Sequence, residues 1–408
     1  MQTPDPVAVR AFLEDRHVEL AAGIAEFGAR EIGTLAEPAD DAAARAQARH
    51  ILEVLGRADW FAPIGDQDLR ACCLIREALA AASPLADAVF ALQALGSLPI
   101  VLAGTAQVKE RWLPAVRAGR AMAAFAMTEP DAGSDVASLA ATARRDGPDY
   151  ILRGTKTLIS NAGIADFYTV FASTDAARGR RGISCFVVPA DAAGLRFVGP
   201  QVLSAPHPLG EIAFTDCRVP AACRVGDEGE GYRLGLATLD RLRATVAAAA
   251  CGMAARALEE ALAHALGRRQ FGKPLAEFQL IQEKLARMAI ELAAARLLVY
   301  RAAWEADRGG SAGGAGSAGG AARVTLEAAM AKAFATEAAQ RIVDAGVQIL
   351  GGRGVLASHP VDRLYRSVRA LRIYEGTTEI QHLIVAGQLI RAAEAARAAA
   401  AGAAGSNP

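Results

Sequence analysis

Apolar residues in the first part of the chain recur at helical spacing. A second apolar stretch runs from Ala86 to Ala103 and stops at Gly104, and the pattern breaks at Gly119 and Arg120. We therefore expect an N-terminal helical domain over residues 1–120. Six early apolar positions fall near a period of about 3.6 residues: Val9, Phe12, Leu13, Val18, Leu20 and Ile24.

The pattern changes over residues 121–228. Short stretches rich in β-branched and aromatic residues alternate with turn-forming pieces such as DGP at 146–148 and GRRG at 179–182. This alternation predicts an antiparallel β domain between two helical regions. The predicted strands include Tyr150–Leu152, Tyr168–Ala172 and Ile183–Val188, and an apolar strand at Ala123–Met127.

Long helical periods return over residues 229–396, and short connections between long helices predict an antiparallel bundle. The expected helices cover about 230–266, 275–307, 323–350 and 377–396. Residues 309–320, GGSAGGAGSAGG, are interpreted as a flexible loop, and 397–408 as an Ala/Gly-rich tail.

The glycine-rich loop formally contains two functional motifs. Residues 314–319 match GxGxxG and residues 309–313 match GxSxG. Both motifs require a preceding strand, whereas here the end of a polar helix, Trp304–Arg308, precedes them. We attribute both matches to repetitive Gly/Ala composition.

Composition excludes several classes of function. The 408 residues include 44 basic and 44 acidic side chains, so no net charge attracts nucleic acid or an anionic membrane. The N-terminus lacks a basic segment followed by an apolar one, and the small apolar run Val246–Ala250 is too short to span a bilayer. The six cysteines form no CxxC pair and no histidines have metal-ligand spacing such as HExxH. We expect a cytoplasmic protein with reduced thiols, no membrane insertion and no metal site.

Four segments together carry the functional information. They are FAMTEPDAGSD at 125–135, GTKTLISNA at 154–162, RRQFGKPL at 268–275 with Phe278, Gln279 and Gln282 after it, and QILGG at 348–352 followed by IYEGTTEIQ at 373–381. Their order and spacing, over about residues 10–392, resemble the acyl-CoA dehydrogenase family. The resemblance implies an FAD enzyme that oxidises an acyl-CoA to a 2-enoyl-CoA. It also implies a homotetramer or homodimer, with an electron-transferring flavoprotein as acceptor.

Two segments of the β domain match the family's flavin-binding positions. The resemblance implies that Phe125, Met127 and Thr128 line the flavin, that Ser134 contacts the flavin or the CoA, and that the Ser160 hydroxyl bonds the flavin ring. The alternative for the first segment is a surface turn, because Pro, Asp, Gly and Ser favour turns. Many members carry an aromatic residue where this chain has Leu158, which puts the electron acceptor in doubt.

Further cofactor contacts are implied on the C-terminal helices. Arg268, Phe271 and Gln279 resemble the segment that reaches the FAD of a neighbouring subunit, where an Arg pairs with the diphosphate. For Arg268 the alternative is a solvent-exposed charge on a helix. For Gly351 and Gly352 the alternative is a helix C-cap. The remaining matched FAD positions are Gln348, Gly351, Gly352, Thr377 and Glu379.

Glu375 matches the family's catalytic base. A carboxylate can remove the α-proton of a thioester if donors such as its own backbone N–H stabilise the enolate, and burial would raise its pKa towards about 6–7. The flavin N5 would accept the β-hydrogen as hydride. An N-terminal-turn Glu that interacts with the helix dipole is the alternative. The family's other base position is Leu242 here, which cannot accept a proton.

Substrate contacts are implied at Asp240, Arg243, Tyr374 and Gly376, besides Ser134. For the Asp240 and Arg243 pair, a structural ion pair within one helix is an equal alternative. The helix at 84–104, which resembles the floor of the acyl pocket, contains no Arg or Lys, which argues against a substrate with a free carboxylate at its acyl end. An acyl-CoA oxidase and a flavin-binding carrier that performs no dehydrogenation are the rival functions.

Overall fold

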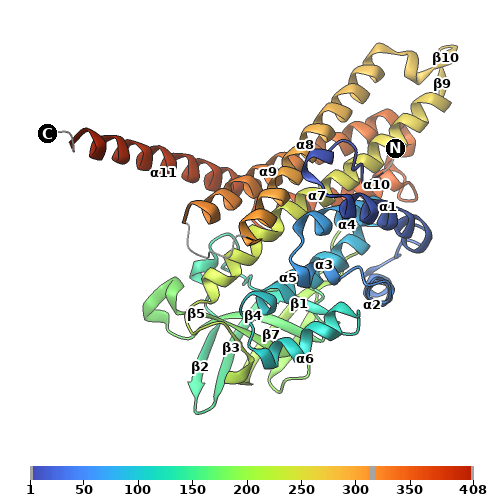
Figure 1. The fold of residues 1–408 in the computed structure, drawn as a ribbon. Coiled ribbons are helices and arrows are strands. Elements are labelled where there is room, and N and C mark those ends of the chain that lie inside the picture. Colours follow the sequence, from blue (N-terminus) through green and yellow to red (C-terminus); the bar gives the residue numbers. More distant parts are fainter. Residues whose placement is uncertain (1–2, 312–317, 406–408) are drawn as a thin grey trace.

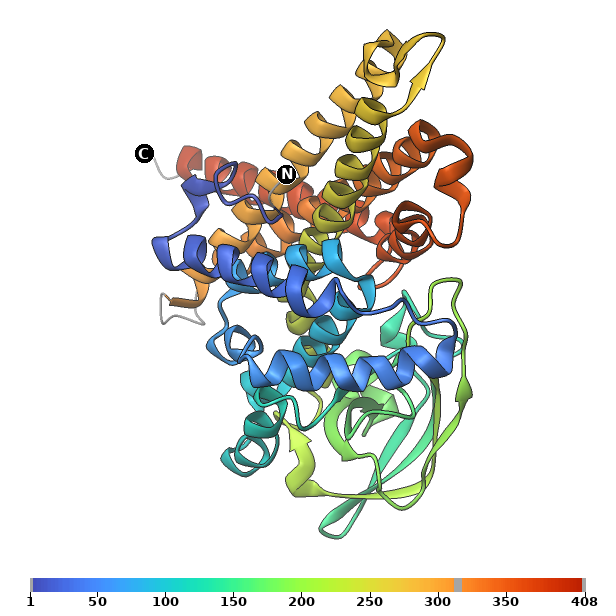
Figure 2. The ribbon, with the colours of Figure 1, turned by 90° about the vertical axis from the view of Figure 1, so that its right-hand side faces the viewer.

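The computed structural model describes residues 3–311 and 318–405, and they form a sheet domain between two helical regions. Figures 1 and 2 show the sheet at one end of the molecule, the long C-terminal helices rising from it, and the N-terminal helices packed along their side. The predicted fold class is confirmed.

The N-terminal region begins later than its apolar pattern suggested. The helical period predicted across Val9 to Ile24 is interrupted, because Leu13 is extended and Glu14 caps a new helix, its backbone N–H donating to His17 Nδ1 at 3.0 Å. The helices of this region are α1 Asp15–Phe27, α2 Asp41–Arg57, α3 Ala62–Asp66, α4 Leu69–Ala82, α5 Pro84–Ala103 and α6 Ala106–Arg117.

Helix α5 is the most apolar element of this region. It starts at the Ser83 cap with Pro84 in its first turn, and its 20 residues are long and apolar enough to cross a membrane, with a mean hydropathy of 1.8. The expectation that no apolar run approaches a bilayer span overlooked this helix. Because 78% of it is buried inside the protein, it has the burial of a core helix.

The sheet domain has the strand order β6-β7-β3-β2-β4-β5-β8, with β1 paired to β4. The prediction of antiparallel strands is wrong in two places. Strand β1 runs parallel to β4, pairing Ala123 with Phe167 through Ala126 with Val170. Thr142 of β2 also pairs with Ser173 in the parallel sense. The strands are β1 Ala123–Ala126, β2 Thr142–Asp146, β3 Asp149–Ser160, β4 Phe167–Ser173, β5 Ile183–Pro189, β6 Leu195–Pro200, β7 Leu209–Pro220 and β8 Arg224–Val225.

The C-terminal region is a bundle with two departures from prediction. Helices α8 and α9 extend into the predicted loop at 309–320, since both continue long packed helices and Ala favours helix; residues 312–317 of that loop lie outside the described chain. Helix α10 was missed, although its Pro360 start is a recognisable signal. The elements are α7 Gly231–Gly267, β9 Arg269–Gln270, β10 Lys273–Pro274, α8 Gln279–Ser311, α9 Ala318–Leu350, α10 Pro360–Leu371 and α11 Thr378–Gly405.

Helix α11 reaches further than the predicted 377–396 and includes most of the predicted tail; residues 406–408 lie outside the described chain. It projects away from the body of the protein (Figure 1).

A buried polar cluster connects the two helical regions. Glu77 of α4 is fully buried and accepts from Arg296 Nε and from the Tyr300 hydroxyl of α8, each at 2.7 Å. The backbones of α4 and α7 also touch, because a Cβ at Gly252 would lie 2.1 Å from the Glu77 carbonyl oxygen. The N-terminal helices are therefore held rigidly against the bundle that carries the C-terminal motifs.

Candidate active site

Glu375 lies in the short turn between α10 and α11. Its backbone is left-handed, with φ of 54°, and Gly376 follows with φ of 90°. Two side chains hold this turn from below: Lys332 Nζ donates to the Gly376 carbonyl at 2.6 Å, and Gln381 Nε2 donates to the Gly376 and Glu375 carbonyls at 3.0 and 3.2 Å. A non-glycine residue in this conformation persists only when its surroundings enforce it.

The Glu375 carboxyl group lies among charged side chains, on a residue that is partly buried. Its Oε2 atom is buried and has no hydrogen-bond partner among the described residues. Burial raises the pKa of this carboxyl, whereas the positive charges of Arg76, Lys332 and Arg243 act in the opposite direction. The result is a carboxylate whose pKa lies above the usual 4.5 of a Glu side chain.

Arg76 is the fully buried partner of this region. It forms two bonds to Asp87 of α5, at 2.7 and 3.0 Å, and a third to the Thr245 hydroxyl at 2.8 Å. This guanidinium lies on α4, outside the helix 84–104 that the sequence indicates as the floor of the acyl pocket, so that helix alone does not reveal it. Since Asp87 already pairs with it, Arg76 contributes little net charge to a ligand.

The matched positions of the β domain lie on β1, on the loop after it and on β3, and we call them the wall. They are Phe125, Met127, Thr128, Leu158 and Ser160. The Thr157 N–H donates to the Thr128 carbonyl at 3.0 Å, which joins the loop after β1 to β3. The pairing of β3 with β7 shifts register between Lys156 and Ile159, a bulge that places Leu158 at φ of 54° and leaves it 56% exposed. Gln201 closes the bulge, accepting from the Leu158 N–H and donating to the Thr157 hydroxyl, both at 2.8 Å.

A buried ion pair fixes the loop that follows Thr128. Lys156 is fully buried, and its Nζ donates to Glu129 Oε1 at 2.7 Å and to the Met127 carbonyl at 3.0 Å. Glu129 also accepts from the Ala140 and Ala141 N–H groups. The alternative of a mere surface turn is therefore wrong for Glu129, which is 6% exposed, whereas Ser134 further along the loop is exposed.

The Ser160 hydroxyl has a protein partner that the sequence did not reveal. It lies 2.8 Å from His207 Nε2. Burial, aided by the positive charge of Arg45, lowers the pKa of His207 to about 4. The imidazole is therefore neutral at neutral pH and can accept from or donate to Ser160.

Shared packing connects the wall to the neighbourhood of Glu375. Phe125 packs on the core cluster that contains Leu92 and Leu95 of α5, and Leu242 belongs to the same cluster, so the family's other base position is apolar and 4% exposed. Met127 fits against α7, since a Cβ at Gly235 would lie 2.4 Å from its terminal carbon.

Further along α7, beyond Gly235, the alternative of an intrahelical ion pair is observed. Arg243 donates to Asp240, which also accepts from Thr325 at 2.8 Å. Arg243 is 4% exposed and acts on the Glu375 charge, so the pair also lies within electrostatic reach of the candidate base.

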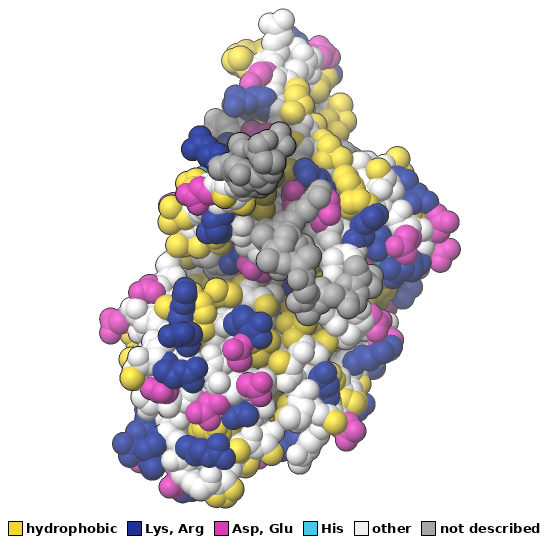
Figure 3. Space-filling model, turned by 60° about the vertical axis from the view of Figure 1, so that its left-hand side comes forward, with side chains coloured by type: hydrophobic (Ala, Val, Ile, Leu, Met, Phe, Trp, Pro, Cys, Tyr) yellow, Lys and Arg dark blue, Asp and Glu magenta, His cyan; other side chains and the backbone are white. Residues whose placement is uncertain are grey.

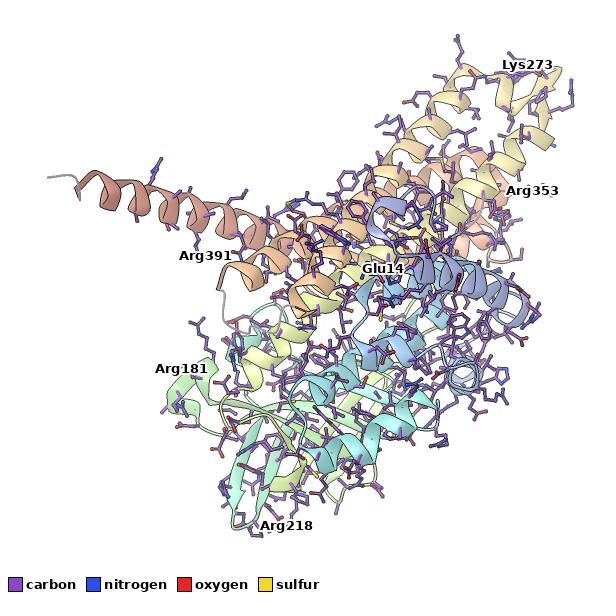
Figure 4. The ribbon with its side chains drawn as sticks, in the orientation of Figure 1. Glu14, Arg181, Arg218, Lys273, Arg353 and Arg391 are labelled. Atoms are coloured by element: carbon purple, nitrogen blue, oxygen red, sulfur yellow. The ribbon has the colours of Figure 1, made fainter. Side chains whose placement is uncertain are left out.

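The segment matched to a neighbouring subunit lies far from these residues within the chain. Figures 1 and 4 show β9 and β10, with Lys273, at the end of the α7–α8 pair opposite the sheet. Arg268 and Gln279 are exposed, and Phe271 is 94% exposed with φ of 49°.

The remaining matched positions are also open to solvent. Gly351 has φ of 60°, and neither it nor Gly352 has a neighbour within 4 Å of a Cβ placed there, so the chain leaves this backbone accessible. Gln348 and Glu379 are exposed, and Tyr374 is 41% exposed beside the base. Thr377 caps α11 by accepting from the Ile380 N–H at 3.3 Å.

Comparisons with known proteins indicate one and the same family for all three regions of the chain. The chain matches the N-terminal, middle and C-terminal domain models of acyl-CoA dehydrogenase over residues 14–120, 124–217 and 229–390. It is 38% identical over 327 residues to the probable acyl-CoA dehydrogenase FadE25 of Mycobacterium tuberculosis, covering 79% of this chain and 81% of that protein. The chain belongs to the acyl-CoA dehydrogenase family.

Two solved structures show the same fold. Butyryl-CoA dehydrogenase from Megasphaera elsdenii superposes with a TM-score of 0.84 at 31% identity, covering 93% of this chain and 99% of that one. An acyl-CoA dehydrogenase complexed with FAD from Bacillus anthracis gives a TM-score of 0.84 at 30% identity, covering 94% and 68%. This acyl-CoA dehydrogenase is thus an oxidoreductase that uses FAD and acts on an acyl-CoA.

The matched residues of this structure fit an FAD. The bulge exposes an apolar side chain at Leu158 beside the hydroxyl groups of Thr128 and Ser160, a combination suited to a flat ring with polar edges. The open backbone at Gly351 and Gly352 permits close approach of a ligand. Both charge signs are interspersed over the visible surface (Figure 3), so a diphosphate requires local cations such as Arg268.

Proposed function

We propose that the enzyme oxidises an acyl-CoA to a 2-enoyl-CoA, with Glu375 as the base that removes the α-proton. The observation that carries this proposal is the buried, unpartnered Oε2 of Glu375, held in a left-handed turn at the junction of both helical regions. A buried carboxylate oxygen with no partner costs free energy, and substrate is the partner that would repay it.

The surroundings of Glu375 suit proton removal. Its raised pKa brings the carboxylate closer to the basicity that the weakly acidic α-carbon requires, while Arg76, Lys332 and Arg243 keep an ionised fraction available near neutral pH. The backbone N–H of Glu375 is proposed as one donor to the thioester oxygen, stabilising the charge that develops there. When bound, FAD supplies the hydride acceptor for the β-hydrogen at its N5.

We assign the wall to the flavin. Phe125, Met127, Thr128 and Leu158 would line it, and the Ser160 hydroxyl would donate to its ring. Ser134, on the exposed loop, would contact the flavin or the CoA. The other FAD contacts are assigned to Thr377 and Glu379 at the start of α11 and to the exposed stretch of Gln348, Gly351 and Gly352. Arg268, Phe271 and Gln279, also exposed, would act on a neighbouring subunit's cofactor.

On the substrate side, Asp240 and Arg243 are proposed to act on the CoA or acyl portion while retaining their ion pair, with Tyr374 and Gly376 beside the reacting carbons. The acyl chain would lie against α5. Arg76 does not provide a free cation there, because Asp87 pairs with it, so a substrate with a free carboxylate at its acyl end is not proposed.

The assembly and acceptor are part of the proposal. Exposed apolar side chains on α8 and α11, including Leu280, Ile290, Leu383 and Ile390, support a homo-oligomer, with a tetramer expected. A cytoplasmic location and an electron-transferring flavoprotein as acceptor are proposed. Leu158 leaves oxygen as the rival acceptor, which is tested by comparing reoxidation of reduced enzyme by air and by that flavoprotein.

The deciding experiment mixes the protein with a panel of acyl-CoA esters under anaerobic conditions and follows bleaching of the flavin band. Glu375→Gln should retain FAD and bind the esters but lose flavin reduction by several powers of ten, because the amide cannot accept the proton. Glu53→Gln, on an exposed position of α2, is the matched control. Near-normal reduction by the Glu375 variant would place the base elsewhere, and no bleaching of wild type by any ester would favour the carrier.

A further inference from the structure

Lys332 is a buried cation inside an otherwise apolar part of α9. Its side chain is fully buried, its neighbours along the helix are alanines and Phe334, and its Nζ donates to the Gly376 carbonyl at 2.6 Å. Burial lowers the pKa of Lys332 to about 8, although the Glu375 charge acts in the opposite direction. The side chain is therefore largely protonated at neutral pH.

Burying an ammonium group costs free energy, and a neutral donor would be enough to satisfy the Gly376 carbonyl. Gln381 already donates a neutral hydrogen bond to the same oxygen at 3.0 Å. Desolvating a cation costs several kcal/mol unless an opposite charge compensates it. The charge nearest along the held turn is Glu375, one residue before the carbonyl that Lys332 binds.

Charged side chains from each helix packed against Glu375 and Lys332 act on these two residues. Glu375 faces Arg76 of α4, Asp87 of α5, Arg243 of α7 and Lys332 of α9. Lys332 faces, besides Glu375, the groups Arg243, Glu337 of its own helix and Glu379 of α11. Arg76 and Arg243 are each paired with an Asp, at Asp87 and Asp240, whereas the bond recorded for the Lys332 ammonium goes to a neutral carbonyl.

We propose that Lys332 is a positioning residue for the base: its ammonium holds the Gly376 carbonyl, and thereby the left-handed Glu375 turn, and its charge keeps the Glu375 carboxylate ionised once substrate excludes water. The inference rests on the proposed function of Glu375. It assigns two separable effects to one side chain, a geometric one through the hydrogen bond and an electrostatic one through the charge.

The electrostatic effect is measured by the pH dependence of flavin reduction in single turnovers. Lys332→Met and Lys332→Gln remove the charge, so the acid limb of the reduction rate should move about 1 pH unit upward, as expected when a nearby opposite charge is lost. Gln381→Leu is the matched control, because it removes donors to the same turn without changing charge. Its acid limb should stay at the wild-type pH.

The geometric effect is measured without turnover, by hydrogen–deuterium exchange of residues 372–380. Lys332→Met and Gln381→Leu should both accelerate exchange there, since each removes a bond to the Gly376 carbonyl. FAD content and melting temperature identify the folded variants.

Folded Lys332 variants with a wild-type acid limb would overturn the inference, as would failure of both to fold, which would make Lys332 a residue of stability alone. If Glu375→Gln itself still reduces flavin, the proposed function fails instead. An inactive Glu375→Gln with unshifted Lys332 variants rejects only the role of Lys332.

Discussion

The Glu375 turn and the β9–β10 tip are both matched to the active site, yet they differ in how the chain supports them. Lys332 of α9 and Gln381 of α11 hold the turn by hydrogen bonds. Arg76 of α4 and Arg243 of α7 act on Glu375 through their charges. At the tip, Phe271 is 94% exposed, and the bonds of Arg269 and Gln270 stay within the tip itself. One region is complete within a subunit, and the other has the features of a surface that a second subunit completes.

This difference indicates a division of labour. Groups that must hold a proton need a fixed and desolvated environment, which one folded chain can provide. The role proposed for the tip, binding the cofactor of a neighbouring subunit, requires reach, which the projecting helix pair α7–α8 would provide (Figure 1).

Complementation between subunits would test this division most severely. Glu375→Gln and Arg268→Glu should each be inactive alone, the first for lack of a base and the second because a carboxylate repels the diphosphate. The two variants are co-expressed with different affinity tags and purified on both. In each mixed pair of subunits, one of the two sites has both intact groups, so mixed assemblies should recover about a quarter or more of the wild-type number of active sites. Mixed assemblies without activity would show that the tip serves its own subunit.

Removing a buried charge next to the wall should lower the free energy of unfolding more than removing an exposed charge. Lys156→Met leaves Glu129 buried without its cation, so the free energy of unfolding should fall by about 3–5 kcal/mol. Arg153→Met is the control, because Arg153 lies on the same strand as Lys156 but forms an exposed ion pair with Asp216. Its loss should change the free energy of unfolding little. Urea unfolding of the two variants measures the contrast, and equal losses would contradict it.

The smallest expected effect concerns His207. Because its folded pKa is about 4 and the ordinary value is 6.5, the unfolded chain binds more protons between these values, and stability falls as pH falls through that window. His207→Asn should reduce this part of the acid loss, while keeping a polar partner for Ser160. Melting temperatures from pH 4 to 7 provide the comparison, and parallel curves would argue against a depressed pKa.

Sequence reasoning recovered the elements with strong periodic signals. The helices of the bundle and strands such as Ile183–Pro189 are continuous patterns with clear ends. Helix α10 was missed because it is short and its start depends on His359 and Pro360 rather than on a long apolar period. The parallel β1–β4 pairing has no local signal, since register between distant segments depends on the whole sheet.

The sequence predicted the positions proposed to contact ligands and not the residues that hold those positions in place. Lys332, Arg76 and His207 act through partners 44, 11 and 47 residues away, so no local motif contains both members of a pair. A single lysine among alanines in α9 was the one available signal, because an unpaired cation at a core position demands a partner.

The bulge at Leu158 has a consequence for how such enzymes diversify. Its exposed side chain is placed by the backbone and by the bond from its N–H to Gln201, and not by packing against neighbours. Mutational drift can therefore exchange an aromatic ring for an aliphatic one here without disturbing the core. The side chain at this position can change while the buried ion pair of Lys156 with Glu129, on the same strand and the neighbouring loop, preserves the scaffold.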